Sequence, residues 1–117
     1  MSIEKEFIPY QQTLALKELG FDEPCFAYYG EINGGEIELF LKKEFNSETP
    51  FVLAPTFSQA FRWFREKGYD VKIQKESDGL YFGFYWTGAA WVIIGVGTYE
   101  EAELECLKKL IEIVKGL

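Results

Sequence analysis

The sequence contains no histidine. Histidine is the usual general base of Ser-His and Cys-His catalytic pairs and the commonest transition-metal ligand. Its absence removes those catalytic classes and most transition-metal sites. We therefore expect no catalytic residues, no metal and no cofactor, and we predict that the protein is not an enzyme.

Cysteine is scarce, with one residue at Cys25 and one at Cys106. Two cysteines are too few for a disulfide-stapled scaffold, and free cysteine packs as a small hydrophobic residue. Cys25 falls at the expected start of a strand, and Cys106 falls on the apolar side of the expected last helix. Two buried, reduced thiols predict a reducing, cytoplasmic location.

Long hydrophobic runs are also missing. The longest apolar run, residues 89–96, is far shorter than the ~20 residues that a membrane-spanning helix needs. Residues 1–10 carry alternating charge with no apolar centre, which does not fit a secretory signal. These features predict a cytoplasmic protein without membrane association.

Basic residues are in the minority. The chain has 12 basic and 19 acidic residues, which give it a net charge of -7. An acidic chain repels phosphate, so we expect no direct nucleic-acid binding. The imbalance lies in residues 1–58, which carry 10 acidic and 4 basic side chains, whereas residues 59–97 carry 4 acidic and 5 basic ones. Arg62 and Arg65 belong to this second region and form either a patch for an anionic ligand or ordinary solubilising charge.

What is present predicts one α+β domain over residues 1–117. Hydrophobic residues make up 48% of the chain, enough for a core, and three helices are expected over residues 9–19, 56–68 and 98–115. The second and third helices open with capping boxes, and the first two end in a glycine followed by an aromatic residue. These signals are Thr56 with Gln59, Thr98 with Glu101, Gly20 with Phe21, and Gly68 with Tyr69.

Five strands are expected between the helices, over residues 26–31, 36–42, 69–75, 80–87 and 90–94. Asn33-Gly34-Gly35 separates the first two strands and is typical of a hairpin turn, because such residues accept positive φ. Strands joined by hairpins pair antiparallel. The order α-β-β-α-β-β-β-α therefore predicts two layers, a five-stranded antiparallel sheet and three helices.

Aromatic residues concentrate in residues 80–91. Strand alternation places Phe82, Phe84 and Trp86 on one face and Tyr81 and Tyr85 on the other, around Gly83. A two-layer sheet needs only one apolar face, so a helix, a second subunit or a ligand must cover the other, or the tyrosine hydroxyls reach water from a half-exposed face. The candidate binding residues are Tyr81, Tyr85, Trp91, Arg62 and Arg65.

Gly95-Val96-Gly97 stands directly before the last helix, where a dinucleotide-binding fingerprint would begin. The third glycine of that fingerprint is replaced by Glu100, and Glu100 and Glu101 put negative charge where a phosphate would lie. We therefore interpret these glycines as the end of a strand.

Three parts of the chain resemble a small family encoded by phages and prophages of gut Bacteroidales. They are the run from Leu53 to Lys67, the run from Thr98 to Glu112, and the opening Phe7 to Tyr10 with Leu19 to Cys25. The resemblance implies a small accessory protein of a mobile genetic element. It implies no activity and no binding residues.

Together these features predict a non-enzymatic accessory protein that acts by binding and self-associates, as a homodimer or larger homo-oligomer, through its aromatic sheet face. One alternative is an acidic charge mimic that inhibits a host protein. The other is a binder of a small anionic ligand, in which Tyr81, Tyr85 or Trp91 stacks on the ligand and Arg62 or Arg65 neutralises it.

Overall fold

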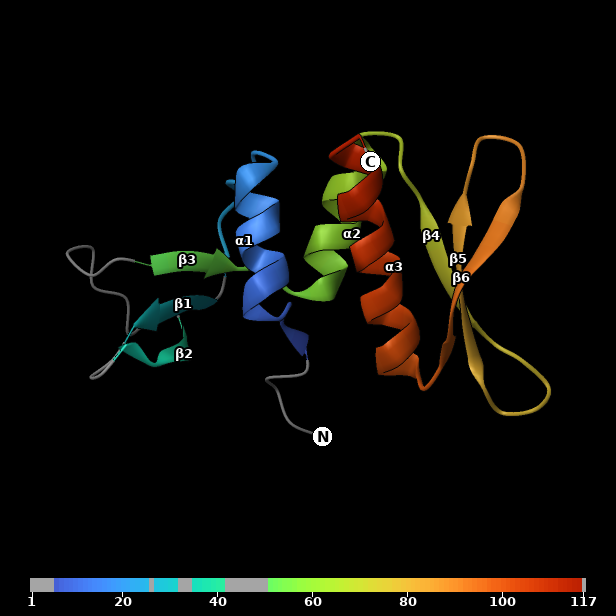
Figure 1. Ribbon diagram of the computed structural model, residues 1–117, viewed down its shortest axis with the longest axis horizontal. Coiled ribbons are helices and arrows are strands. Elements are labelled where there is room, and N and C mark those ends of the chain that lie inside the picture. Colours follow the sequence, from blue (N-terminus) through green and yellow to red (C-terminus); the bar gives the residue numbers. More distant parts are fainter. Residues whose placement is uncertain (1–5, 26, 32–34, 42–50, 117) are drawn as a thin grey trace. The chain divides into compact units, whose positions relative to one another are not determined.

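The computed structural model describes residues 6–25, 27–31, 35–41 and 51–116. The elements follow in the order α1 (Tyr10–Glu18), β1 (Ala27–Glu31), β2 (Ile37–Leu41), β3 (Phe51–Ala54), α2 (Phe57–Glu66), β4 (Val71–Lys75), β5 (Tyr81–Trp86), β6 (Trp91–Gly97) and α3 (Tyr99–Val114). The chain divides into two compact units, residues 1–56 with α1 and one sheet, and residues 57–117 with α2, α3 and a second sheet (Figure 1).

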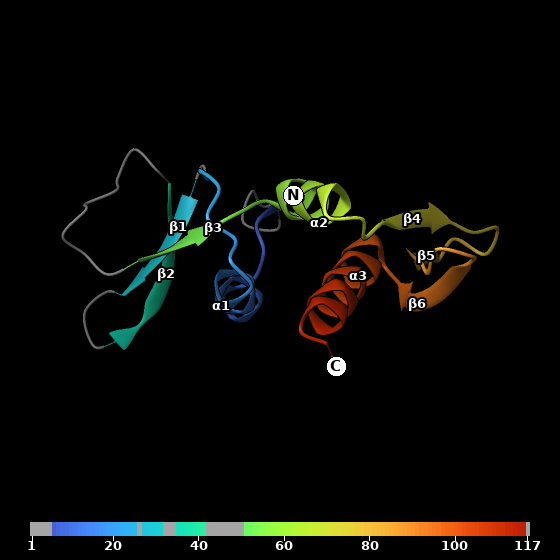
Figure 2. The same cartoon turned by 90° about the horizontal axis from the view of Figure 1, so that it is seen from above.

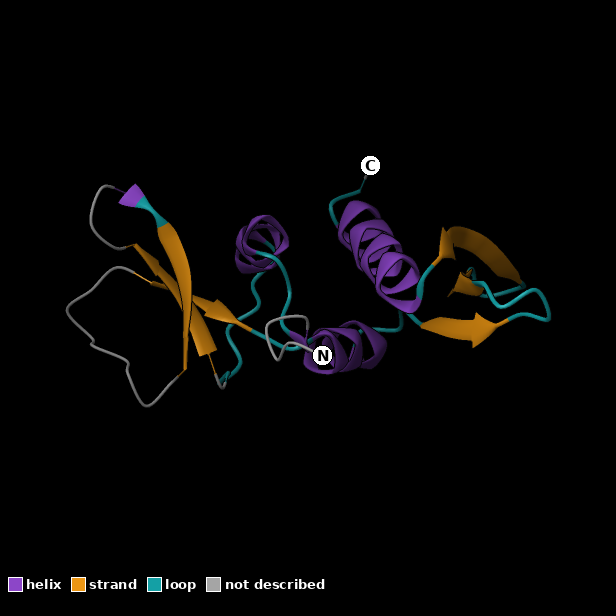
Figure 3. Ribbon diagram, turned by 90° about the horizontal axis from the view of Figure 1, so that it is seen from below, coloured by secondary structure: helices purple, strands orange, loops and turns teal. Residues whose placement is uncertain are grey.

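The first unit contains an antiparallel sheet in the order β2-β1-β3, with α1 beside β3 (Figure 3). Phe7, Ala27 and Ala54 form its buried cluster. The hydroxyl of Tyr29 donates a 2.6 Å hydrogen bond to the carbonyl of Ile8, which ties the segment before α1 to the sheet. This hydrogen bond and the buried cluster both connect the segment before α1 to the sheet of the first unit.

Both predicted glycine stops end their helices as expected. Gly20 has φ +97°, and the N–H of Phe21 donates to the carbonyl of Leu16 at 3.0 Å. In α2, Gly68 has φ +95° and the N–H of Tyr69 donates to the carbonyl of Phe64 at the same distance. This is the hydrogen-bond pattern of the Schellman motif, and each glycine supplies the left-handed residue that the motif requires.

The second unit packs α3 against one side of the antiparallel sheet β4-β5-β6, with α2 against α3 (Figure 2). Its buried side chains come from both helices. They are Phe57, Ala60, Trp63, Phe64, Ala102, Cys106, Leu107, Leu110 and Ile111. The predicted capping box of α3 is confirmed, because Glu101 N–H donates to Thr98 Oγ1 at 3.1 Å and Thr98 N–H donates to Glu101 Oε1 at 2.9 Å.

The α+β class and the three helices are confirmed, but the single five-stranded sheet is wrong. The structure has two three-stranded antiparallel sheets instead. The strand that the sequence did not reveal is β3, whose Phe-Val-Leu-Ala run lacks alternation and leads straight into Pro55 and α2. Its partner is β1, through pairs such as Ala27 with Ala54, so β1 is the central strand of the first sheet. Asn33 and Gly34 of the predicted turn, and residues 26 and 42 of the predicted strands, lie outside the described residues.

Candidate functional site

The two faces of the second sheet have different surroundings. A Cβ atom built on Gly83 would lie 2.6 Å from Cys106 Sγ, and one on Gly95 would lie 2.7 Å from Glu105 Cβ. These two glycines are cross-strand partners, so α3 crosses the sheet directly over them. Tyr81 and Tyr85 alternate with Gly83 along β5 and therefore share the face that α3 covers.

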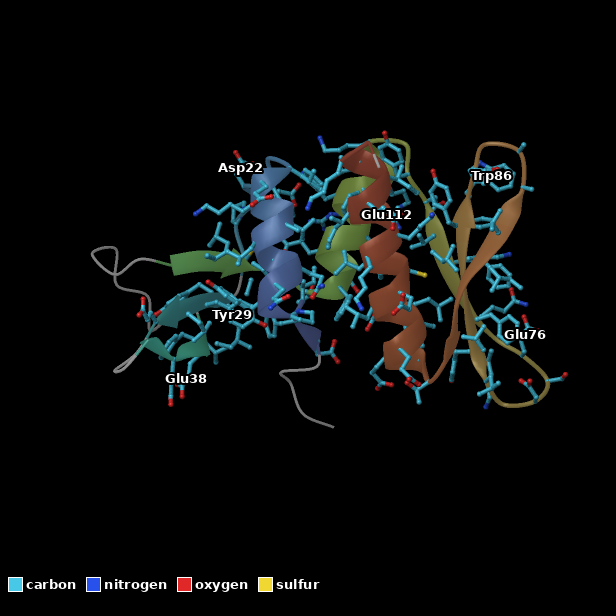
Figure 4. The ribbon with its side chains drawn as sticks, viewed as in Figure 1. Asp22, Tyr29, Glu38, Glu76, Trp86 and Glu112 are labelled. Carbon is cyan, nitrogen blue, oxygen red and sulfur yellow. The ribbon has the colours of Figure 1, made fainter. Side chains whose placement is uncertain are left out.

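The opposite face is open and mostly apolar. We call it the aromatic face; its apolar side chains are Phe82, Phe84, Trp86, Trp91, Ile93 and Val96. Trp86 and Trp91 are 36% and 38% exposed, and Ile93 and Val96 are 52% and 50% exposed. Figure 4 shows Trp86 close to the turn between β5 and β6, with Glu76 towards the opposite end of the sheet. Contiguous exposed apolar surface of this kind marks interaction sites.

The rings of the aromatic face contact one another. Trp86 and Trp91 are opposite each other in the register, with ring centroids 5.2 Å apart. Phe82 and Phe84 lie at 6.3 Å. These spacings fall in the range of favourable aromatic pairs, so the face is a preformed surface rather than a set of separate side chains.

One lysine lies on the aromatic face. Lys72 is opposite Phe84 in the register, and its Nζ lies 5.1 Å from the centre of the Phe84 ring and 4.6 Å from that of Trp91. An ammonium group within ~6 Å of a ring centre is attracted to the ring face. The Lys72 ammonium is therefore held against the rings of the aromatic face.

The hairpin that supplies most of this face contains no charged residue. Residues 79–99, which cover β5, the turn and β6, include no Asp, Glu, Lys or Arg, in a chain that is 26% charged. We call these residues the uncharged hairpin. Its composition was visible in the sequence and is the signal that could have identified the whole surface, including Phe82, Phe84, Trp86, Ile93 and Val96.

The five candidate binding residues lie in three different places. Tyr81 and Tyr85 are half-buried on the α3 side of the sheet, and the Tyr81 ring packs edge-on against Tyr99 at 5.4 Å. Trp91 lies on the aromatic face. Arg62 and Arg65 are exposed on α2. The structure therefore does not bring the five residues together: of these five residues, the aromatic face contains Trp91 alone.

A groove of about 510 Å³ lies in the first unit, beside the end of α1. Its lining comes from α1, the turn that follows and β3, and comprises Thr13, Lys17, Gly20, Phe21, Asp22, Val52 and Leu53. None of the five candidate binding residues lines it. The Thr13 hydroxyl in the wall of this groove already donates its hydrogen to the carbonyls of Ile8 and Pro9, so it has no hydrogen left to donate to a ligand.

The thiol groups are placed for packing. Cys25 is buried and its thiol donates to the carbonyl of Glu23 at 3.3 Å. Cys106 is fully buried beneath the sheet, and burial, reinforced by the negative charge of Glu103, raises the pKa of its thiol to about 12. A thiol that keeps its proton to such a pH is a poor nucleophile.

The raised pKa of Cys106 predicts a loss of stability at high pH. Between the ordinary thiol pKa of 9.0 and about 12, the unfolded chain loses this proton while the folded chain keeps it. The free energy of unfolding of the wild type should therefore fall with rising pH by up to about 1.4 kcal/mol per unit more steeply than that of Cys106→Ala. Urea unfolding of both proteins between pH 8 and 11 tests this, and parallel curves would contradict it.

The N-terminus of α3 is occupied by its own side chain. Glu101 accepts the N–H of Thr98, and this hydrogen bond lowers the pKa of the Glu101 carboxyl. The carboxylate thus lies where a bound phosphate would be held at a helix start. The geometry agrees with the interpretation of residues 95–97 as the end of a strand, which here is β6.

Within the parts of the chain that the structure describes, no cluster of three or more His, Cys, Asp or Glu residues is arranged to hold a metal ion. In the same residues, no helix combines the length and apolar character needed to cross a membrane.

Comparison with protein-family models, with curated proteins and with solved structures gives no match for this chain. Function is therefore inferred from the surfaces of the chain itself.

Proposed function

We propose that this protein acts by binding rather than by catalysis, and that it self-associates through the uncharged hairpin of residues 79–99. The observation that carries the proposal is the exposed aromatic face on a hairpin without charge. In keeping with the sequence resemblance, we propose that it serves as an accessory protein of a phage or prophage.

Electrostatics favours a second copy of the chain as the occupant of this surface. Two copies with a net charge of -7 repel each other, and contact is least opposed where neither copy presents a carboxylate. The uncharged hairpin meets this condition and offers tryptophan, which is enriched at interfaces. Twofold homodimers are also the commonest soluble assemblies.

Adding one negative charge to the hairpin should dissociate the assembly. Ile93 is the most exposed large apolar residue of the aromatic face, at 52%. We expect Ile93→Glu to raise the dimer dissociation constant at least tenfold, because its carboxylate would have to be desolvated in the contact. Sedimentation velocity over a concentration series measures this.

The matched control is Ile37→Glu, which makes the same change on β2 of the first unit, where Ile37 is 40% exposed. This variant should associate like the wild type. Equal association of the wild type and Ile93→Glu would overturn the proposal, and so would equal loss in both variants.

A second candidate function is supported by the charge of the first unit. Its residues 1–56 hold 10 acidic and 4 basic side chains, and Glu31, Glu36 and Glu38 are exposed on or beside β1 and β2. Such a surface suits a charge mimic that binds a basic host protein. Binding of this kind should weaken steeply with added salt, whereas self-association through an uncharged hairpin should not.

A further inference from the structure

Strand β6 is an edge strand whose outer backbone groups point away from the sheet. The sheet order is β4-β5-β6, so β6 has one strand neighbour among the described residues. Trp86 N–H donates to the carbonyl of Asp70, on the β4 side, whereas Thr87 N–H donates to the carbonyl of Ala90 across the β5–β6 turn. Because bonding alternates along an antiparallel pair, the N–H and C=O groups of Trp91 and Ile93 point away from β5.

The two edges of this sheet differ in how they are protected. The β4 edge carries Lys72 and Lys75, and edge lysines discourage pairing with another chain. The β6 edge reads Trp-Val-Ile-Ile-Gly-Val-Gly, with neither charge nor proline. Of the two edges, β6 is the one on which a further strand can pair.

Exposure of Val92 distinguishes an edge contact from a face contact. Val92 is opposite Tyr85 in the register and therefore points to the α3 side, yet it is 46% exposed. A partner lying on the aromatic face would leave Val92 in water. It would also bury the Lys72 ammonium of both copies, and removing a charged group from water is costly. A strand paired at the edge covers apolar side chains on both faces and leaves Lys72 exposed.

We infer that two copies of this chain pair through β6, antiparallel and about a twofold axis at Val92, to continue one sheet across both copies. The inference rests on the proposed self-association and specifies its geometry. Trp91 of each copy is then opposite Ile93 of the other, and each of these two pairs exchanges two backbone N–H···O bonds. On the aromatic face each tryptophan packs against an isoleucine, a favourable cross-strand pair, and on the α3 side Val92 meets its own copy.

The bulge in β6 limits the length of this pairing. The register moves from Gly83 opposite Gly95 to Phe84 opposite Ile93, so Ile94 is an extra residue in β6. A bulge disrupts the ladder and bends the strand. The segment that pairs between the two copies is therefore Trp91 to Ile93, and the twofold axis at Val92 lies at its centre.

Hydrogen exchange of the wild-type protein tests the geometry without any substitution. The amide N–H groups of Trp91 and Ile93 should exchange fast in dilute monomer and at least tenfold more slowly in the associated protein. The Val92 N–H faces β5 and should be protected at both concentrations. Association that leaves Trp91 and Ile93 exchanging at the monomer rate would overturn the edge pairing and leave the proposed self-association standing.

A pair of matched variants gives the second test. Val92→Lys puts a like charge on the twofold axis and should abolish the dimer. Val96→Lys, which is 50% exposed on the aromatic face beyond the bulge, should retain it. The reverse result would show that the copies pack through the aromatic face, and a wild type that is monomeric at all concentrations would refute the proposed function itself.

Discussion

Replacement of Gly83 by alanine should destabilise the protein by about 1–3 kcal/mol, the usual cost of overpacking a close contact. The new Cβ would lie 2.6 Å from Cys106 Sγ and 3.1 Å from the carbonyl oxygen of Ala102. Neither atom can move freely, because Cys106 and Ala102 are fully buried on α3. Chemical denaturation of Gly83→Ala and the wild type measures the difference in the free energy of unfolding.

Gly30→Ala is the control for this prediction. Gly30 also lies within a strand, and its added Cβ would meet the Tyr28 and Phe40 rings at 3.5 Å, an ordinary contact distance. Its effect should stay within about 0.5 kcal/mol, since the loss of chain entropy in the unfolded state favours alanine slightly. Equal destabilisation by both substitutions would contradict the close approach of α3 to β5.

Phe64→Ala should lower the free energy of unfolding still further, by about 3–5 kcal/mol. Phe64 is fully buried, and its ring packs edge-on against Trp63 at 5.0 Å. Removing it leaves a cavity in the core of the second unit. Thermal or urea unfolding followed by tryptophan fluorescence measures the loss.

Phe61→Ala makes the same change three residues earlier on α2, where the side chain is half-buried. Its cost should be clearly smaller, because part of the ring is already in water. A Phe64→Ala variant as stable as Phe61→Ala would show that Phe64 is not at the centre of the core.

The helices could be predicted because their signals are local. Thr98 with Glu101, and Gly20 and Gly68 with the aromatic residues after them, determine backbone hydrogen bonds within a few positions. The division into two sheets could not be predicted in this way. It depends on the pairing of β3 with β1, which are distant in the sequence. Residues Phe51–Ala54 show no alternation of apolar and polar side chains that would predict a strand.

The aromatic face could be predicted only in part from the sequence. Alternation along β5 correctly separated Phe82, Phe84 and Trp86 from the tyrosines, but it does not say which set α3 covers. Two glycines of this sheet indicate which face the helix covers. Gly83 and Gly95 are opposite each other, and because they have no side chain they leave room for α3 on the tyrosine side. Cross-strand glycines next to a helix thus mark the face of the sheet that the helix covers, and here the aromatic face is the one left exposed.

Sedimentation equilibrium of the wild-type protein, over micromolar to millimolar concentrations and at low and high salt, tests the central claim most directly. We predict a transition from the 13.5 kDa monomer to a particle of twice that mass, with added salt leaving the association intact or strengthening it. A monomer at every concentration and both salt levels would contradict self-association through the uncharged hairpin.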